Sequence, residues 1–339
     1  MDDWKEMIFF MTSSLTANMS MYKSFLFDSP AMKTLIKDAI FHDSAVQNAD
    51  SKLKHNLAEH GKVCWQFLMV YIICAFGILF SLYAGSIILY MISLNCDSTV
   101  DECKRSLAWP SVSIFSLESQ YGVSLIVNSI GMTFLGGFVL VGNITLASVC
   151  IFPTFKLKHL QYVLTNFQYY GEILSKSENI PIRNAEYFII RECVIEHQRI
   201  IRDFEKLKES TKVLFLLDFI THAMQTAPYL LIIMAYDGNI DYLITMTVSC
   251  MAFVIFELFM VYWFAQGVID ESINVGTCIG LSNWYEADVR TLKLLQLLMI
   301  RSIHRLALRV GPFYDMELNI FLKICKMMYT VVTVFKRQL

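Results

Sequence analysis

The last apolar stretch of the chain carries polar side chains at a spacing that could do chemistry. From Phe313 to Phe335 the sequence has the length and apolar bulk of a membrane span, yet two lysines lie inside it. Polar residues recur there at steps of three and four, which places them on one face of a helix. This polar stripe consists of Asn319, Lys323, Lys326, Thr330, Thr333 and Arg337. Its ammonium, amide and hydroxyl groups could contact water or ions.

Three arrangements of the polar stripe are open. A charge at the centre of a bilayer costs at least about 2.5 to 3.5 kcal/mol, so two lysines facing lipid would be strongly unfavourable. The lysines could lie near the cytoplasmic surface, with their long stems reaching into the headgroups. They could pair with Asp315, Glu317 or another helix. The stripe could instead line an aqueous conduit, which a single helix cannot enclose and which therefore implies several subunits around an axis.

Acidic residues are rare in the other apolar stretches. Asp218 and Glu257 are the only ones well inside them, and each could be a buried, hydrogen-bonded structural group. A membrane enzyme or transporter would place catalytic or coupling groups there. The sequence contains no nucleotide-binding loop, zinc-spaced cysteine set, His-Glu-x-x-His motif or hydrolase elbow. We therefore expect no enzyme activity, no cofactor, no metal and no nucleic-acid partner.

The composition predicts an all-α, polytopic transmembrane helical bundle. Hydrophobic residues make up 55% of the 339 residues, charged residues only 17%, and mean hydropathy is +0.49. One globular core could not hide that much apolar surface. A span needs roughly 20 mostly apolar residues, and six stretches qualify within a single domain, 1–339. They are 5–27, 66–94, 122–152, 212–236, 242–268 and 313–335.

The distribution of positive charge predicts the orientation. Lysine and arginine number five in 28–65, nine in 153–210 and five in 269–311, against two in 95–121. Basic loops are cytoplasmic by the positive-inside rule. The C-terminus is then extracellular, as is the loop that contains Cys96 and Cys103. Those two cysteines are candidates for a disulfide in an oxidising compartment, and two free thiols near a membrane surface are the alternative.

Two charged segments, 153–211 and 269–311, predict cytoplasmic helical extensions. Apolar residues keep a helical spacing in both segments. In the first these are Tyr187, Ile190, Val194, Ile201 and Phe204, and in the second Trp284, Leu292, Leu295, Met299, Ile303 and Leu306. Such helices could lie on the lipid surface or pack against one another. Packing is favoured, because these segments supply one another's partners.

The chain from Asn283 onward resembles the C-terminal signature of insect odorant receptors. The resemblance rests on Asn283-Trp284-Tyr285-Glu286, Leu294-Leu295-Gln296, Arg301-Ser302, Gly311, Phe321, Lys323-Ile324, Lys326 and Met328-Tyr329-Thr330-Val331-Val332-Thr333-Val334. The order of the spans extends it more loosely over nearly the whole chain. That family has seven spans, a cytoplasmic N-terminus and an extracellular C-terminus. Six spans are visible here, so the chain looks as if it lacks the family's first helix.

The resemblance implies an odorant-binding subunit of a ligand-gated, non-selective cation channel. Four subunits, usually tuning subunits with a shared co-receptor, would surround a pore in the plasma membrane of olfactory neuron dendrites, in contact with lipid. By resemblance Val334 and Gln338 close the gate, whereas periodicity alone selects Thr330, Thr333 and Arg337. The candidate pore group is Lys326, Thr330, Thr333, Val334, Arg337 and Gln338. Four copies of Arg337 would oppose cation flow, which favours a tuning subunit in a mixed tetramer.

The ligand implied is a small, volatile, apolar odorant. The family's pocket lies in the outer half of the bundle, and such a ligand needs aliphatic and aromatic walls. The matching ends of the spans hold residues spaced by about three or four, although ordinary helix packing would give the same pattern. The candidate pocket residues are Tyr83, Ile87, Tyr90, Met91, Ile126, Ile130, Phe134, Tyr242 and Met246.

Two other receptor classes are alternatives. Gustatory receptors typically end in Thr-Tyr, five residues and Gln-Phe, whereas here Tyr329 follows Met328 and the later pair is Phe335-Lys336. A G-protein-coupled chemoreceptor predicts a cytoplasmic tail and motifs such as Asp-Arg-Tyr or Asn-Pro-x-x-Tyr, which this sequence does not contain.

Overall fold

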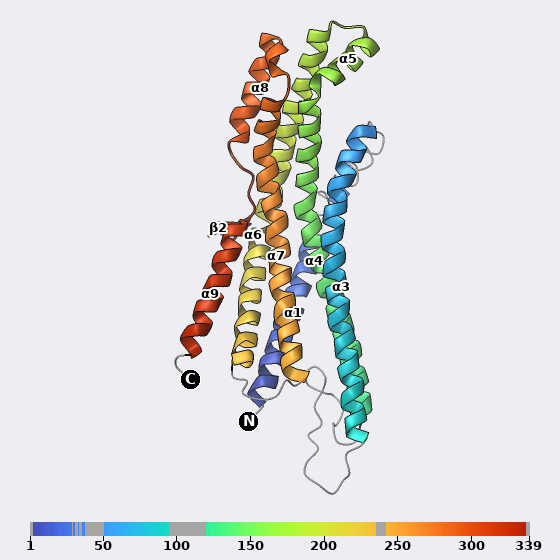
Figure 1. Cartoon of the computed structure of the whole chain (residues 1–339), viewed down its shortest axis with the longest axis vertical. Coiled ribbons are helices and arrows are strands. Elements are labelled where there is room, and N and C mark those ends of the chain that lie inside the picture. The colour runs from blue at the N-terminus through green and yellow to red at the C-terminus, as the bar shows by residue number, and fades with distance from the viewer. Residues whose placement is uncertain are drawn as a thin grey trace.

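Long helices run side by side along the molecule (Figure 1). The structure is a computed structural model that describes residues 3–28, 30, 33, 36–37, 51–94, 120–234 and 242–336. The long helices are α1 (Asp3–Phe27), α3 (Ser51–Leu94), α4 (Tyr121–Thr165), α6 (Ile182–Met234) and α7 (Tyr242–Leu281). Shorter elements are α5 (Phe167–Glu178), η1 (Trp284–Glu286), α8 (Val289–Ser302), β1 (Arg309–Val310), β2 (Tyr314–Asp315) and α9 (Leu318–Lys336). The predicted all-α class is confirmed.

Several helices are much longer than a membrane is thick. Helices α3, α4, α6 and α7 contain 44, 45, 53 and 40 residues. At 1.5 Å per residue they are about 60 to 80 Å long, roughly twice the hydrocarbon thickness of a bilayer. Each must therefore continue beyond the membrane, as the charged segments at 153–211 and 269–311 predict.

Four helices in the described part of the chain are long and apolar enough to cross a membrane. They are Gly61–Met91, Tyr121–Thr165, Ile182–Met234 and Ile244–Leu281. The predicted spans at 5–27 and 313–335 correspond to α1 and α9, which are not among these four. Both lie alongside the same half of the bundle as the apolar parts of the four (Figure 1).

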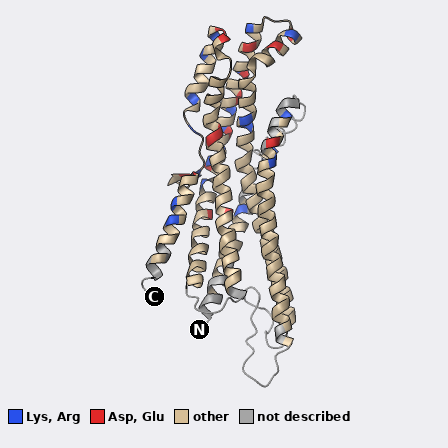
Figure 2. Ribbon diagram, viewed as in Figure 1, with Lys and Arg blue, Asp and Glu red and all other residues tan. Residues whose placement is uncertain are grey.

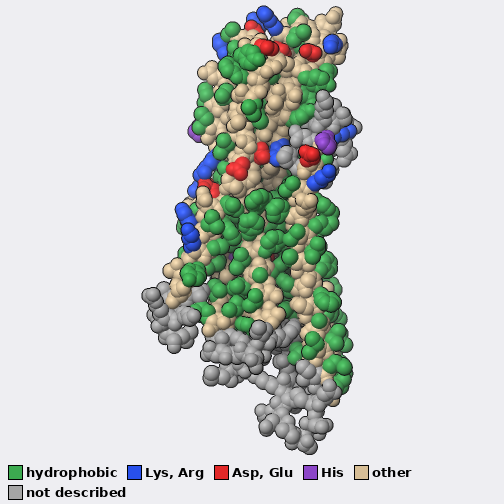
Figure 3. Space-filling view, viewed as in Figure 1, with side chains coloured by type: hydrophobic (Ala, Val, Ile, Leu, Met, Phe, Trp, Pro, Cys, Tyr) green, Lys and Arg blue, Asp and Glu red, His purple; other side chains and the backbone are tan. Residues whose placement is uncertain are grey.

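The molecule divides into an apolar half and a charged half. Charged residues gather around α5 and α8 and in a belt halfway along the bundle, whereas the other half is mostly uncharged apart from α9 and a small internal group (Figure 2). Hydrophobic side chains cover the visible face of that uncharged half (Figure 3). Large apolar side chains are exposed there on α3 and α4, among them Ile73, Phe76, Phe80, Phe134 and Phe138. A surface of this size and character faces lipid.

Helix α7 lies at the centre of the packing. It contacts α3, α4, α6, α8 and α9, and Met260, Ala265 and Val268 on it have no exposed surface. In the charged half, α8 packs against α6 and α7 through Leu295 and Leu298, each 2% exposed. Of the predicted apolar stripe, Leu295 and Leu306 are buried, whereas Trp284, Met299 and Ile303 are exposed. The protein's own helices therefore cover only part of that stripe.

The predicted helical spacing from Trp284 to Leu306 is wrong at its end, because α8 stops at Ser302. The chain then becomes extended, and Leu306, Leu308 and Val310 alternate as buried residues. An alternation of period two is the burial pattern of a strand, not of a helix. The extended segment is fixed to α7, since the Leu306 backbone N–H donates to Ser272 Oγ at 3.0 Å.

A short hairpin precedes the last helix, which begins at Leu318 and not at Phe313. Strands β1 and β2 pair antiparallel, with Val310 opposite Tyr314. Gly311 makes the turn with φ of +55°, a left-handed conformation that glycine adopts without steric cost. Its N–H donates to the Lys212 carbonyl of α6 at 3.0 Å. The hairpin thereby fixes where α9 leaves the bundle.

Replacing Gly311 with alanine should destabilise this junction. The new Cβ would lie 2.9 Å from Leu216 Cδ2, and the left-handed backbone costs a non-glycine residue about 1 to 2 kcal/mol. We expect a lower melting temperature for purified Gly311→Ala in detergent. The control is Gly280→Ala, a helical position where an added Cβ meets nothing within 4 Å. Equal melting temperatures for the two variants would contradict this account.

Candidate functional site

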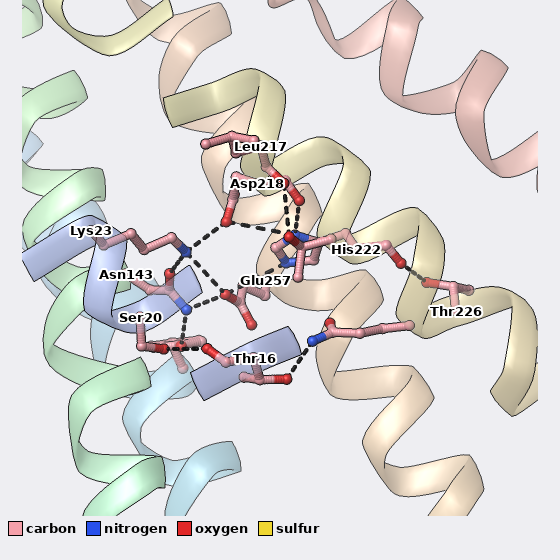
Figure 4. Close-up of polar contacts among 12 residues, drawn as sticks. Thr16, Ser20, Lys23, Asn143, Leu217, Asp218, His222, Thr226 and Glu257 are labelled. Atoms are coloured by element: carbon pink, nitrogen blue, oxygen red, sulfur yellow. Dashed lines mark hydrogen bonds and ion pairs between the residues drawn. The ribbon is translucent and has the colours of Figure 1, made fainter. Parts of the chain in front are cut away.

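A cluster of charged side chains is buried inside the apolar half of the bundle. It consists of Lys23 on α1, Asp218 and His222 on α6 and Glu257 on α7, and we refer to it as the charge cluster (Figure 4). The side chains are only 4 to 8% exposed. Glu257 lies 15 residues from Tyr242, the start of α7, which corresponds to about 22 Å along the helix. The cluster therefore lies deep within the apolar half.

The charge cluster is tightly connected. Lys23 Nζ lies 2.6 Å from Asp218 Oδ1 and 3.8 Å from Glu257 Oε1. Lys23 also donates a hydrogen bond to Asn143 Oδ1 on α4. The amide of Asn143 in turn donates to Glu257 Oε1 and, at 2.9 Å, to the Tyr71 hydroxyl on α3. Side chains from α1, α3, α4, α6 and α7 thus meet at one point.

His222 lies between the two carboxylates. Its Nδ1 is 3.7 Å from Asp218 Oδ1 and its Nε2 is 3.5 Å from Glu257 Oε1. A proton on both ring nitrogens would balance two anions against two cations, so that no net charge is buried. An isolated buried charge is very unfavourable, whereas a paired and hydrogen-bonded one is tolerated. The arrangement is therefore well matched to a low-dielectric setting.

A cavity of about 340 Å³ adjoins the charge cluster. Its walls come from α1, α3, α4, α6 and α7, and most are apolar, including Ile78, Leu79, Leu82, Met132, Leu140 and Val254. Glu257 and Tyr71 belong to both the cavity wall and the cluster network. The volume and the few polar groups are typical of small-molecule sites.

The predicted pocket residues lie near this cavity but do not line it. Seven of them, Tyr83, Ile87, Tyr90, Met91, Ile126, Ile130 and Phe134, are 41 to 69% exposed on α3 and α4. Met246 is 3% exposed and packs with Leu82 and Tyr229 beside the cavity. The side chain of Tyr242 lies outside the described part. Tyr83 reaches the cavity wall indirectly, through a 2.5 Å hydrogen bond to Thr133. Ligand contact by these residues remains a prediction.

The predicted pocket residues lie on α3, α4 and α7, which are three of the five described helices that line the cavity, but not on the faces that line it. On a membrane helix the lipid-facing side is as apolar as the packed side, so hydrophobic periodicity does not separate the two. The signal that does separate them is a charged residue in an apolar span, which almost always faces the protein interior. Lys23 and His222 carried that signal alongside Asp218 and Glu257.

The polar stripe of α9 points away from the protein's own bundle. Asn319, Lys323, Lys326 and Thr330 are exposed and Thr333 is half-buried. On the opposite face, Phe321 and Ile324 are buried. The Phe321 ring centroid lies 5.6 Å from that of Phe259 and 6.2 Å from that of Tyr262, both on α7. Within one subunit, the stripe is therefore uncovered.

The proposed pairing of the stripe lysines with nearby carboxylates is wrong for Asp315 and Glu317. Arg305 reaches Glu317 at 2.6 Å and Asp315 at 3.2 Å. Arg309 lies 3.5 Å from Asp315. Among the residues described, neither Lys323 nor Lys326 is within ion-pair distance of a carboxylate.

Some candidate residues fall outside what the structure describes. These are Arg337 and Gln338 of the gate group and the cysteines at 96 and 103, and the side chain of Val334 is likewise not described. Across the described ranges, no group of three or more His, Cys, Asp or Glu side chains is placed to hold a metal ion.

The fold and the site define a multi-pass helical membrane protein with a ligand-sized cavity inside its apolar half. Comparison with known proteins specifies the family. Residues 5–329 match the family model described as 7tm Odorant receptor, so the chain belongs to the odorant receptor family.

Mosquito receptors are among the similar sequences. The chain is 24% identical over 190 residues to Odorant receptor 10 of Aedes albopictus, which covers 56% of this chain and 48% of that protein. It is 26% identical over 148 residues to Odorant receptor Or2 of Anopheles gambiae, covering 44% of this chain and 39% of that one. The matched region spans about half or less of the length of these relatives.

A solved insect receptor shares the fold. The olfactory receptor OR5 of Machilis hrabei in complex with eugenol superposes with a TM-score of 0.73 at 15% identity, covering 96% of this chain and 79% of that one. Another structure of OR5 superposes with a TM-score of 0.57 at 13% identity. The helical arrangement is therefore that of insect olfactory receptors.

Replacing Lys23 should destabilise the protein through the charge cluster. Lys23→Met leaves Asp218 and Glu257 buried without their ammonium partner, and breaking a buried ion pair in this way costs about 3 to 5 kcal/mol. The double variant Lys23→Met/Asp218→Leu should recover part of the lost stability, because Glu257 and His222 can then pair with each other. Thermal unfolding of purified protein in detergent measures both.

The matched control is the exposed ion pair between Lys33 and Asp28, which has the same 2.6 Å separation. Its side chains are 56% and 78% exposed, so Lys33→Met should cost less than about 1 kcal/mol. If Lys23→Met and Lys33→Met lowered stability by similar amounts, burial of the charge cluster would make no difference to stability.

Proposed function

We propose that this chain is the odorant-binding subunit of a ligand-gated, non-selective cation channel. It assembles with a co-receptor subunit in the plasma membrane of olfactory neurons, with its C-terminus outside the cell. The ligand is a small volatile molecule of mainly apolar character. Membership of the odorant receptor family supports the sensory role.

The outward-facing polar stripe of α9 is the observation that carries the channel proposal. Lys323, Lys326 and Thr330 are exposed, while the opposite face of the same helix is packed on α7. Lipid is an unfavourable neighbour for lysine. Water in a pore between subunits satisfies these groups, and a ring of subunits is the arrangement that encloses such a pore.

The apolar cavity supports the ligand-binding part of the proposal. Its volume of about 340 Å³ and its aliphatic walls suit a volatile molecule of modest size. The structural relative from Machilis hrabei was solved with eugenol, a small organic compound. We assign the ligand to this cavity and not to the exposed outer face of α3 and α4.

Helix α7 offers a direct route from the cavity to the pore helix. Phe253 and Glu257 line the cavity, and Phe259 and Tyr262, within the next two turns, contact Phe321 of α9. A ligand that fits better when α7 is shifted would therefore bias the position of α9. The size of that bias equals the difference in its affinity for the two arrangements.

Co-expression tests the proposal. With a co-receptor present, we expect an odorant panel to evoke cation current that is absent when this chain is omitted. Patch-clamp recording under G-protein blockade is the measurement, and the current should persist. A response that requires G proteins and lacks a direct conductance would favour a G-protein-coupled chemoreceptor instead.

Neutralising a stripe lysine should raise cation conductance. Lys326→Gln removes one positive charge from the proposed pore lining, and a unit charge about 8 Å from a passing cation in water changes the rate roughly twofold. Single-channel recording measures this. Lys176→Gln on α5, an exposed lysine far from α9 in sequence, is the matched control and should leave conductance unchanged. A fall in conductance in Lys326→Gln would argue against a pore-facing stripe.

A further inference from the structure

The cavity is not uniformly apolar, because it ends against the charge cluster. Among its lining residues Glu257, Gln225, Thr16 and Tyr71 carry polar groups, and Thr133 and Tyr229 carry further hydroxyls. Glu257 and Gln225 are only 6% and 5% exposed. Gln225 lies three residues after His222, which puts it one turn along the same face of α6. Since His222 lies beside Glu257, the side chains of Glu257 and Gln225 belong to the end of the cavity next to the charge cluster.

One oxygen of Glu257 is fully engaged and the other is not. Asn143 donates to Oε1, and the nitrogens of Lys23 and His222 lie 3.8 and 3.5 Å from that same atom. No described residue donates a hydrogen bond to Oε2. Glu257 lines the cavity, and a carboxylate oxygen without a protein donor can accept a further hydrogen bond, so Oε2 offers a strong acceptor to whatever occupies the cavity.

Gln225 shows the same asymmetry. Its Nε2 donates to the Thr16 hydroxyl on α1. Among the described residues, nothing donates to its Oε1. The polar end of the cavity therefore presents two acceptor oxygens, Gln225 Oε1 from α6 and Glu257 Oε2 from α7. No hydrogen bond from a described residue reaches either oxygen.

We infer that the ligand of this cavity carries a hydrogen-bond donor, a hydroxyl or an amine, at one end of an apolar body. A hydroxyl donates its one proton to Glu257 Oε2 or Gln225 Oε1, an amine has a second N–H for the other oxygen, and the apolar body packs among Leu79, Leu82 and Met132. A carbonyl supplies no proton to these oxygens, and a ligand carboxylate meets the negative charge of Glu257. This ligand class rests on the proposed function, because it assigns the odorant to this cavity.

Matched series of ligands test the effect of the terminal group separately from that of the apolar body. The series 2-phenylethanol, phenylacetaldehyde, propylbenzene and phenylacetate keeps one ring and changes only the terminal group. A hexyl and a monoterpene series repeat the comparison on other apolar bodies. The readouts are the half-maximal concentration for current with a co-receptor and the thermal stabilisation of the purified chain. We expect alcohols to act at concentrations at least about tenfold lower than aldehydes or hydrocarbons, because a donor to a charged acceptor has that effect on affinity.

Variants of the two acceptors test their assignment. Gln225→Met keeps the side-chain length and removes the acceptor oxygen, and Glu257→Gln removes the charge while Lys23 stays paired with Asp218. Each should lower the alcohol-to-hydrocarbon ratio without abolishing the response to hydrocarbons, because Gln225→Met removes one of the two acceptors and Glu257→Gln replaces a charged acceptor with a neutral one. Glu209→Gln makes the same carboxylate-to-amide change at an exposed site on α6 and should preserve the tenfold ratio.

The outcomes distinguish this inference from the proposed function. Equal potency of alcohols and hydrocarbons in the unmodified chain, or a ratio unaffected by both acceptor variants, overturns the donor preference and leaves the receptor role intact. Absence of both current and stabilisation for every series overturns the proposed function itself.

Discussion

The rest of the structure depends on the buried ion pair between Lys23 and Asp218. A lysine in the interior of an apolar bundle is tolerated only where a carboxylate and further hydrogen bonds surround it. Here Asp218 lies 2.6 Å away, and Asn143, Glu257 and His222 complete the shell. These groups come from four helices, so satisfying them fixes how far α1, α4, α6 and α7 slide along one another. Apolar contacts alone would permit several such registers, because lipid-exposed and packed faces are equally hydrophobic.

The charge cluster also constrains the part of α7 that lines the cavity and contacts α9. Glu257 lines the cavity, and two residues further along α7 Phe259 packs against Phe321 of α9. A short part of one helix thus belongs to the cavity wall, to the charge cluster and to the α9 contact. Because Glu257 is held by the cluster, displacement of α7 must also change the contacts of Lys23 and His222. The cavity wall and α9 are therefore connected through a polar network as well as through apolar packing.

Much of the fold could be predicted from hydropathy and charge. Long apolar stretches separated by basic segments predicted a polytopic helical bundle with helical extensions, and helices α3 to α7 have this form. The end of α8 was missed, although Leu306-Ala307-Leu308-Arg309-Val310 shows the alternation of an extended segment. Leu306 also fits a helical spacing, and only the docking of its N–H on Ser272 selects the extended form. The start of α9 was misplaced for the same reason, since Gly311 and its contact with Lys212 belong to the tertiary structure.

The sequence by itself determined the class of protein, the amphiphilic character of the final helix and the family resemblance, because composition, periodicity and motifs are properties of the chain. Only the tertiary structure decided which side chains meet. It paired Arg305 with Asp315 and Glu317, left the stripe lysines facing outward, and joined Lys23 to Asp218, 195 positions later in the chain. It also placed the cavity on the inner faces of α3 and α4. Such pairings depend on how helices distant in sequence approach one another, and no local pattern of residues specifies that approach.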